Sequence, residues 1–340
     1  MKRNWTSYWM LIACLMIIGV AAACGNTNKQ GQTATEEIAA IDARGQKIVL
    51  NEHAKRVVVL FEPFVDELYM LGAGDLLVGI PQQIYQNPST FHFLSKMDRR
   101  IAQKQIATPT FGGRSTHIET LVALRPDLAI VYEHDKETIA QLEDLDIPVY
   151  VVSSRGKSHI YEELIGVGTL LGKAARAQQI IEYVEAEVKK MTLPDNIKRR
   201  KVYYAWSKGR IFSTSCKGSL VDLSMQVSGA ENACPLTLEA PNISAESIYK
   251  WNPDLIILWN SKLDDVYQLE ELASLPAVVN KQVYVMEPTF YYDPHTVKFL
   301  LFAKQLRQWS YPAYTEQDFE RERQETLTFL YDGQIGQEEI

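Results

Sequence analysis

Short, nearly unbroken apolar runs recur along this chain, with room for a helix between one run and the next. Runs that are short and rich in β-branched residues are typical of strands buried on both faces of a parallel sheet. These runs cover residues 56–61, 76–80, 127–132, 148–153, 201–206, 254–259 and 283–287. Stretches such as 65–72 and 135–145 have a helical period. The alternation predicts an α/β fold.

The segment between the two halves, residues 158–191, has a helical period except in the glycine-bearing stretch "GVGTLLGK". Unbroken, such a helix would be about 50 Å long at about 1.5 Å per residue, and Pro194 ends it. We therefore expect two Rossmann-like α/β lobes joined by one long connecting helix. The predicted boundaries are 45–157 for the N-terminal lobe, 158–192 for the helix and 193–340 for the C-terminal lobe.

The N-terminus has its own pattern. Lys2 and Arg3 precede an apolar run, residues 10–23, that ends in small residues before Cys24. That run is shorter than the roughly 20 residues needed to span a bilayer, so it predicts a signal peptide, residues 1–23. A buried N-terminal helix is the alternative. "VAAACG" resembles a bacterial lipobox, which implies lipidation of Cys24 and anchoring on the outer face of the cell membrane, with residues 24–44 as a flexible tether.

One pattern occurs twice. "IETLVALRPDLAIVY" begins at Ile118 and "AESIYKWNPDLIILW" begins at Ala245, and the two align without a gap. In each copy the proline is expected to end a short helix and the Asp-Leu to enter a buried strand. Each helix carries an acid in its first turn, Glu119 or Glu246.

The net charge bears on the possible partners of the protein, and the cysteines bear on whether it contains a disulfide. The chain has 35 basic and 42 acidic residues, a net charge of −7, which argues against a nucleic-acid partner. An oxidising location permits a disulfide between Cys216 and Cys234. A helix in the interval between them would hold its ends roughly 15 Å apart, whereas a bridge needs Cα atoms within about 7 Å. Two separate buried thiols are therefore the favoured expectation, and a bridge stays open.

Two lobes form a cleft, and the carboxyl ends of parallel strands open into it. Aromatic, basic and acidic residues gather at these strand ends and in the loops beside them. The candidate ligand-binding residues are Glu62, Phe111, Arg114, Tyr132, Trp206, Lys208, Trp259, Tyr291 and Tyr292. His134 and His295 also fall at predicted cleft edges. Each side chain alone fits half-buried packing or a solvated loop, and their coincidence on one edge favours a binding site.

Several motifs occur in a family-specific order: "AKRVVVL", "LGAGDLLVGIP", "HIETLVALRPDL", "GSLVDLSMQVSGAENA" and "ISAESIYKWNPDL". Over about residues 41–319 the chain resembles the class III substrate-binding lipoproteins of bacterial ABC importers for iron chelates, haem and cobalamin. It departs from the family in "FYYDPHTV", where many relatives have a glycine- or arginine-bearing loop. This departure leaves the identity of the ligand open.

The resemblance implies a receptor without a cofactor that delivers its ligand to a permease dimer with a cytoplasmic ATPase. It also implies that Glu119 and Glu246 dock onto arginine pockets of the permease. The alternative is structural, because an acid in a first turn offsets the helix dipole by about 0.3–1 kcal/mol. For Glu119 the spacing from Thr116 also fits a capping box.

Two other classes of function compete with the receptor. An enzyme lacks support, since the chain has no G-x-S-x-G, H-E-x-x-H or P-loop motif. A free zinc or manganese receptor would need three or four converging ligands, whereas the six histidines are scattered. Arg114, Lys208 and Lys262 near the cleft suggest an anionic ligand. A ferric siderophore is preferred; ferric citrate, haem and molybdate or tungstate stay open, and charge disfavours cobalamin.

Overall fold

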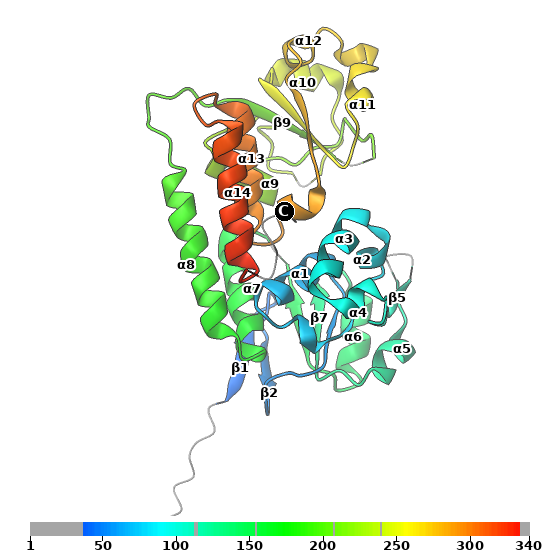
Figure 1. Ribbon diagram of the computed structural model, residues 1–340. Helices are drawn as coiled ribbons and strands as arrows, with labels where there is room; N and C mark the ends of the chain where they lie inside the picture. Colours follow the sequence, from blue (N-terminus) through cyan, green and yellow to red (C-terminus); the bar gives the residue numbers. More distant parts are fainter. Residues whose placement is uncertain (1–36, 112–114, 154, 207, 239, 334–340) are drawn as a thin grey trace, which may run out of the picture. The chain divides into compact units, whose positions relative to one another are not determined.

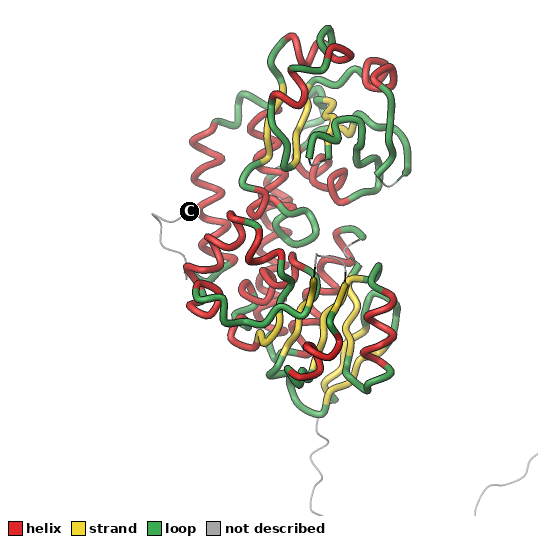
Figure 2. The backbone as a smooth tube through the Cα atoms, turned by 90° about the vertical axis from the view of Figure 1, so that its right-hand side faces the viewer, coloured by secondary structure: helices red, strands yellow, loops and turns green. Residues whose placement is uncertain are grey.

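The computed structural model describes residues 37–111, 115–153, 155–206, 208–238 and 240–333, with only the backbone at residue 111 (Figure 1). The signal peptide and Cys24 lie outside these residues. Within them are two separate four-stranded parallel sheets, in the orders β4-β3-β7-β8 and β10-β9-β11-β12. Figure 2 shows them as two groups of strands that are separated in space, one in each lobe. The predicted two-lobe α/β fold is confirmed.

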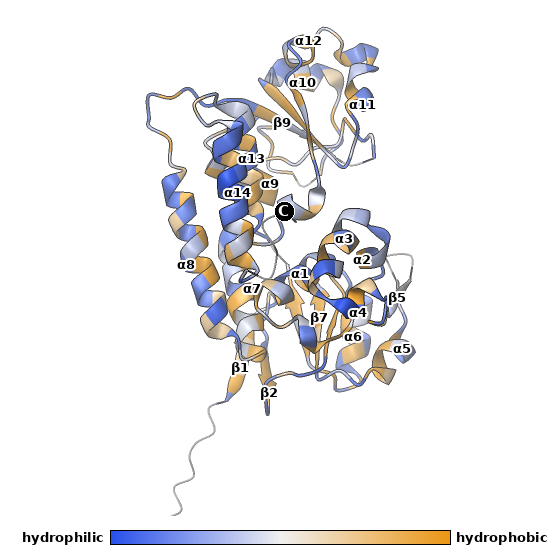
Figure 3. Ribbon diagram, viewed as in Figure 1, coloured by the Kyte–Doolittle hydropathy of each residue, from blue (hydrophilic) through white to orange (hydrophobic). Residues whose placement is uncertain are grey.

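Seven of the eight sheet strands match the apolar runs of the sequence to within a few residues, whereas β10 was not predicted. In the N-terminal lobe they are β3 (Val57–Val59), β4 (Leu77–Gly79), β7 (Leu128–Tyr132) and β8 (Val149–Val152). In the C-terminal lobe they are β9 (Lys201–Ala205), β10 (Glu231–Asn232), β11 (Leu255–Trp259) and β12 (Val283–Met286). Most of their apolar side chains are buried, as parallel sheets require, and Figure 3 shows the strands largely in the colour of hydrophobic residues.

The helices of the lobes follow the strands along the chain. Those of the N-terminal lobe are α1 (Glu62–Met70), α2 (Gln83–Gln86), α3 (Pro88–Met97), α4 (Arg99–Ala102), α5 (Ile118–Ala123) and α6 (Lys136–Glu143). Those of the C-terminal lobe are α9 (Leu220–Ser228), α10 (Ala245–Trp251), α11 (Asp264–Tyr267), α12 (Pro276–Val279) and α13 (Phe299–Ser310). No helix in the described ranges is both long and apolar enough to cross a membrane.

The repeated sequence pattern forms the same unit in both lobes. Helices α5 and α10 lead into β7 and β11, which occupy the same third place in their sheets. The repeated aspartate also has one role: Asp127 accepts the backbone N–H of Arg56 at 2.9 Å, and Asp254 accepts that of Lys201 at 2.8 Å. Each carboxylate thus satisfies a backbone donor at the start of the neighbouring strand.

The prediction of a single long connecting helix is wrong in detail. The segment forms two helices, α7 (Lys157–Leu170) and α8 (Ala174–Lys190), which pack against each other. The chain reverses at Gly172, which has φ +70°, a conformation that favours glycine. Of these two helices, α8, about 25 Å long at 1.5 Å per residue, runs between the lobes.

A second helix accompanies α8, and the sequence did not reveal it. Helix α14 (Glu316–Leu330) lies antiparallel to α8, because Arg176 near the start of α8 donates to Leu330 O at 3.0 Å. Near the other end, the buried Lys304 of α13 bridges Glu187 of α8 at 2.6 Å and Glu322 of α14 at 2.8 Å. The lobes are therefore joined by a helix pair.

The tether expected up to residue 44 is too long. Strands β1 (Ile38–Ile41) and β2 (Lys47–Leu50) form an antiparallel pair. This pair is attached to the N-terminal lobe, since Ala43 N donates to Val151 O at 2.9 Å and Tyr150 Oη donates to Ile41 O at 3.1 Å. The short strands β5 (Thr110–Phe111) and β6 (Ser115–Thr116) were likewise not predicted.

Candidate functional site

A cavity of about 710 Å³ lies between the carboxyl ends of the two sheets. We call it the aromatic cavity. Tyr132 at the end of β7 lines it from the N-terminal lobe, and Trp259 at the end of β11 and Trp206 directly after β9 line it from the C-terminal lobe. Adjacent strand ends thus bring together residues that are far apart in the sequence. The predicted cleft position of these three aromatic residues is observed.

Packing behind the cavity fixes the ring of Tyr132. It stacks on Phe61 with ring centroids 4.3 Å apart and planes at 13°, and the ring of His134 lies 4.8 Å away. Trp259 stacks on the buried Phe302 with centroids 6.1 Å apart. The aromatic faces are therefore held before any ligand arrives, which reduces the entropy lost on binding.

A pair of loops that the sequence analysis missed forms another wall of the aromatic cavity. Residues 211–219 and 233–243, apart from residue 239, run side by side, joined by the backbone bonds Lys217 N to Leu236 O at 3.0 Å and Ile243 N to Phe212 O at 2.8 Å. Ser215 and Lys217 line the cavity from the first loop, and Leu238 lines it from the second. They were missed because they do not stand directly at strand ends.

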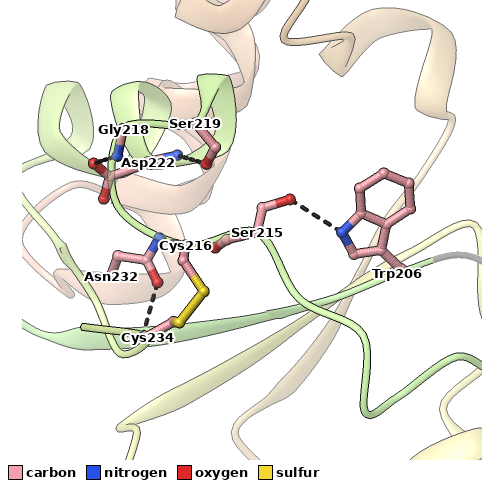
Figure 4. The surroundings of a disulfide bond; sticks show 8 residues. All are labelled: Trp206, Ser215, Cys216, Gly218, Ser219, Asp222, Asn232 and Cys234. Carbon is pink, nitrogen blue, oxygen red and sulfur yellow. Dashed lines mark hydrogen bonds between the residues drawn. A yellow bond between two sulfur atoms is a disulfide. The ribbon is translucent and has the colours of Figure 1, made fainter. Parts of the chain in front are cut away.

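The favoured expectation of two separate thiols is wrong, because Cys216 and Cys234 form a disulfide with Cα atoms 5.0 Å apart (Figure 4). Helix α9 fills only part of the interval, and the chain on both sides of it turns back. Both cysteines are fully buried. The disulfide therefore ties together the two loops that line the cavity.

A hydrogen-bond chain connects this disulfide region to Trp206 (Figure 4). Asn232 accepts the backbone N–H of Cys234 at 3.0 Å, and its Nδ2 donates to Ser215 O at 2.9 Å. Ser215 Oγ in turn accepts the indole Nε1–H of Trp206 at 3.0 Å. The loop pair thereby sets the orientation of one of the cavity's main aromatic surfaces.

Charged side chains of both signs line the aromatic cavity. Arg155 makes a two-bond ion pair with Glu133, with Nε at 2.9 Å from Oε1. Asp293 Oδ1 accepts the backbone N–H of His295 at 2.9 Å and lies 2.8 Å from Nδ1 of the His295 ring. Burial alone would raise the pKa of the Asp293 carboxyl, but His295 and Lys298 hold that pKa below its ordinary value.

A second cavity of about 830 Å³ also has walls from both lobes, and we call it the amide cavity. It contains two further predicted residues, Glu62 at the start of α1 and Lys208 in the loop after β9. Burial and the nearby Asp293 raise the pKa of Glu62, although Thr90 donates a hydrogen bond to its Oε1 at 3.1 Å. Lys208 is exposed and forms no ion pair within the described residues.

The remaining predicted ligand residues are not placed in these cavities. Tyr292 is 1% exposed, lies in the hydrophobic core and donates to Gln305 at 3.2 Å. Tyr291 packs edge-on against Phe93 with centroids 5.4 Å apart. Both therefore support the loop that carries Asp293 and line neither cavity. The side chain of Phe111 and the whole of Arg114 lie outside the described residues.

A buried ion pair behind the cavities was also missed by the sequence analysis. Lys298 is 1% exposed, and its Nζ lies 2.6 Å from Asp66 Oδ2, while Tyr331 donates to Asp66 Oδ1 at 2.6 Å. This cluster connects α1 of the N-terminal lobe with the C-terminal helices. No sequence signal marks it, because a helical lysine ordinarily lies on the surface.

The two repeated glutamates are both exposed in the first turns of their helices. Neither has a hydrogen bond or ion pair within the part of the chain that the structure describes. The capping box at Glu119 is wrong, since the N-cap residue is His117 and makes no side-chain cap bond. At Glu246 the cap is Ser244, which accepts the N–H of Ser247 at 3.3 Å.

In the described ranges, no group of three or more histidine, cysteine, aspartate or glutamate side chains is placed to hold a metal ion. The histidines at the cleft, His134 and His295, lie beside Glu133 and Asp293 respectively. What the aromatic cavity offers is therefore ring faces and charged hydrogen-bonding groups, which suit a ligand of several hundred cubic ångströms.

Parallel sheets, a helical connection and a ligand-sized interlobe cavity define a class III solute-binding fold. A family model described as periplasmic binding protein matches residues 57–289, and the chain belongs to this family. The predicted resemblance to substrate-binding proteins of ABC importers is thereby confirmed.

Known proteins of this kind align over most of the chain. An uncharacterized ABC transporter substrate-binding lipoprotein of Bacillus subtilis, YvrC, is 23% identical over 82% of this chain and 88% of its own length. The iron(3+)-hydroxamate-binding protein FhuD of the same organism is 25% identical over 82% and 90%. The molybdate-bound structure of MolA from Haemophilus influenzae superimposes with a TM-score of 0.73 at 19% identity, covering 86% of this chain and 98% of MolA.

Proposed function

We propose that this protein is the extracytoplasmic receptor of an ABC importer and binds an anionic iron chelate in the aromatic cavity. The observation that carries the proposal is the convergence of Tyr132, Trp206 and Trp259 from two lobes on one cavity of about 710 Å³. A metal chelate presents a broad, partly apolar surface, which such rings cover well. The iron(3+)-hydroxamate relative supports an iron chelate as the ligand.

The charge of the ligand follows from the unpaired cations. Lys217 at the aromatic cavity and Lys208 at the amide cavity have no ion-pair partner among the described residues. An anionic ligand would complete their charge-assisted hydrogen bonds. Arg114, which precedes the first repeat in the sequence, is proposed to act in the same way.

An oxyanion such as molybdate is the second candidate, favoured by the fold likeness to MolA. A tetrahedral oxyanion needs a tight set of donors rather than aromatic walls. The lining of the aromatic cavity therefore supports the chelate more strongly. Ferric citrate, haem and cobalamin are further candidate ligands to be compared with the chelate and the oxyanion.

A thermal-shift screen of the full chain tests the proposal. A ligand at 100 times its dissociation constant adds about 2.7 kcal/mol of stability, enough for a clear rise in the unfolding midpoint. We expect an anionic ferric siderophore to produce that rise, and the same siderophore without iron, molybdate and zinc chloride to produce none. A shift with zinc alone, lost on adding chelator, would favour the free-metal receptor instead.

We further propose that the receptor is lipid-anchored through Cys24 on the outer face of the cell membrane. The relative YvrC is named a lipoprotein. One acyl chain gives only marginal membrane binding, so durable anchoring takes more than one chain. Delivery would then use Glu119 and Glu246, whose exposed carboxylates have no partner among the described residues and lie at equivalent positions of the two lobes.

A further inference from the structure

The two lobes contribute different chemistry to the aromatic cavity. Every described lining residue from the N-terminal lobe carries a polar group: Tyr132, Glu133, His134, Ser153 and Arg155. From the C-terminal lobe, the first turn of α9 and the second loop of the pair add aliphatic side chains, those of Leu220, Val221, Leu238 and Ala240. We call these four residues the aliphatic wall. The cavity is therefore polar on one side and partly apolar on the other.

Polar side chains next to the aliphatic wall do not close it to an apolar group. Ser215 Oγ accepts the indole N–H of Trp206 at 3.0 Å, and Ser219 Oγ accepts the backbone N–H of Asp222 at 3.1 Å (Figure 4). Both hydroxyl oxygens are thus used within the protein. Lys217 also lines this side of the cavity and is exposed. A lysine can lay its stem along apolar surface while its ammonium group points away from it.

Leu238 is the most accessible leucine of the aliphatic wall, with 57% of its surface exposed. Of the exposed large apolar residues in the described ranges, it is the one that lines the aromatic cavity. Covering such a side chain with an apolar group is favourable, because apolar surface is removed from water. The loop that carries Leu238 is tied to its neighbour by the disulfide of Cys234 and by the bond from Lys217 N to Leu236 O at 3.0 Å. The apolar surface is therefore in place before a ligand arrives.

We infer that the aliphatic wall binds an aliphatic arm of the iron chelate, so that the ligand of this receptor is amphiphilic. The anionic metal-binding head lies against the rings of the aromatic cavity, and the arm covers Leu238. This inference rests on the proposed receptor function and specifies its ligand further. Molybdate and ferric citrate have no such arm and would leave Leu238 exposed.

Two anionic ferric complexes that differ in one chain test this inference. Both use a citrate-dihydroxamate chelator, whose iron complex is negatively charged because citrate supplies a carboxylate and an alkoxide beside the two hydroxamates. One has acetyl groups on both hydroxamate nitrogens, and in the other an octanoyl group replaces one acetyl. Dissociation constants are measured by isothermal titration for the wild type, Leu238→Ser and Leu236→Ser. Leu236 is the matched control, since it is 39% exposed in the same loop and does not line the aromatic cavity.

We expect the wild type to bind the octanoyl complex about 10-fold more tightly than the acetyl complex, because the longer chain removes more apolar surface from water. Leu238→Ser should reduce this preference about 5-fold by weakening the octanoyl complex alone. Leu236→Ser should keep the preference of the wild type. Both leucines are exposed, so both variants should keep the wild-type unfolding midpoint.

Equal wild-type affinity for the two complexes, an unchanged preference in Leu238→Ser or the same loss in Leu236→Ser would each overturn the inference. A lowered unfolding midpoint in Leu238→Ser would also overturn it, because the leucine would then be part of the folded core. Octanoate alone should not compete with the octanoyl complex, and competition at similar concentrations would make the wall a fatty-acid site. If the two complexes bind equally well, the aliphatic arm is refuted and the receptor function stands. If neither complex binds, the inference fails, whereas the receptor function fails only if no ferric chelate raises the unfolding midpoint.

Discussion

Removing the Cys216–Cys234 disulfide should destabilise the C-terminal lobe by an amount that follows from the loop it closes. The two cysteines are 18 residues apart. In the chain-entropy model a closed loop of that size corresponds to about 3 kcal/mol at 25 °C. Both cysteines are fully buried, so replacement by serine also places two hydroxyls in a core position. We therefore expect Cys216→Ser/Cys234→Ser to lose at least roughly 3 kcal/mol.

Guanidinium unfolding followed by far-ultraviolet circular dichroism measures this loss. Wild type without reductant is compared with wild type in reductant and with the double variant in both conditions. Wild type should unfold at a lower denaturant concentration once reduced, and the double variant should be insensitive to reductant. Thiol titration in denaturant should find two more free thiols in reduced than in oxidised wild type.

The same change should also affect the ligand site, because the disulfide ties the loops that hold Ser215 and, through it, the indole of Trp206. Ser215→Ala removes only the last link and should weaken chelate binding by about 2- to 10-fold, the range of one hydrogen bond. Ser215→Thr keeps the hydroxyl and should restore most of the affinity. Equal stability of oxidised and reduced wild type, or an unchanged affinity in Ser215→Ala, would refute this reasoning.

Three further predictions concern other parts of the molecule. Glu119→Arg/Glu246→Arg should abolish uptake and permease binding, because a desolvated interfacial charge contributes roughly 2–5 kcal/mol, while ligand affinity stays the same. The control is Glu137→Arg, which changes another exposed acid in the first turn of a helix. Normal uptake in the double variant would contradict docking. Cys24→Ala should leave the protein without lipid in metabolic labelling and absent from the membrane fraction; unchanged fractionation would contradict anchoring. Glu67 is fully buried, and burial with the nearby Glu163 raises its pKa well above 4.5. The wild type therefore loses stability as the pH rises from the pKa of Glu67 in the unfolded state toward its pKa in the folded state. Glu67→Gln should gain stability relative to the wild type between pH 5 and pH 8, and parallel pH profiles of the two proteins would contradict this.

The sheets and the repeated units could be predicted from the sequence because a buried parallel strand must be apolar over its whole length. Residues 254–259, for example, have no other plausible place than a sheet interior. The helix pair between the lobes could not be predicted in the same way. Helical period continues on both sides of Gly172, and only the three-dimensional packing of α7 on α8 shows that the chain reverses there.

The candidate site was predicted in part for a related reason. Trp206 directly follows β9 and Trp259 is the last residue of β11, so sheet topology places both at the cleft. Tyr292 also follows a strand, but a short 3₁₀ helix (Thr289–Tyr292) turns it into the core. The disulfide and Ser215 depend on how two loops return toward each other, which no local pattern determines.

The central claim is that a ferric chelate binds against the tryptophans of the interlobe cavity, and fluorescence titration tests it most directly. Ferric chelates quench nearby tryptophans, so titration of the wild type should give saturable quenching. In Trp206→Phe/Trp259→Phe most of this quenching should disappear and the affinity should fall. The control Trp251→Phe/Trp309→Phe, which changes two tryptophans that line neither cavity, should keep the wild-type affinity and its quenching. Wild-type quenching and affinity in Trp206→Phe/Trp259→Phe would contradict the account.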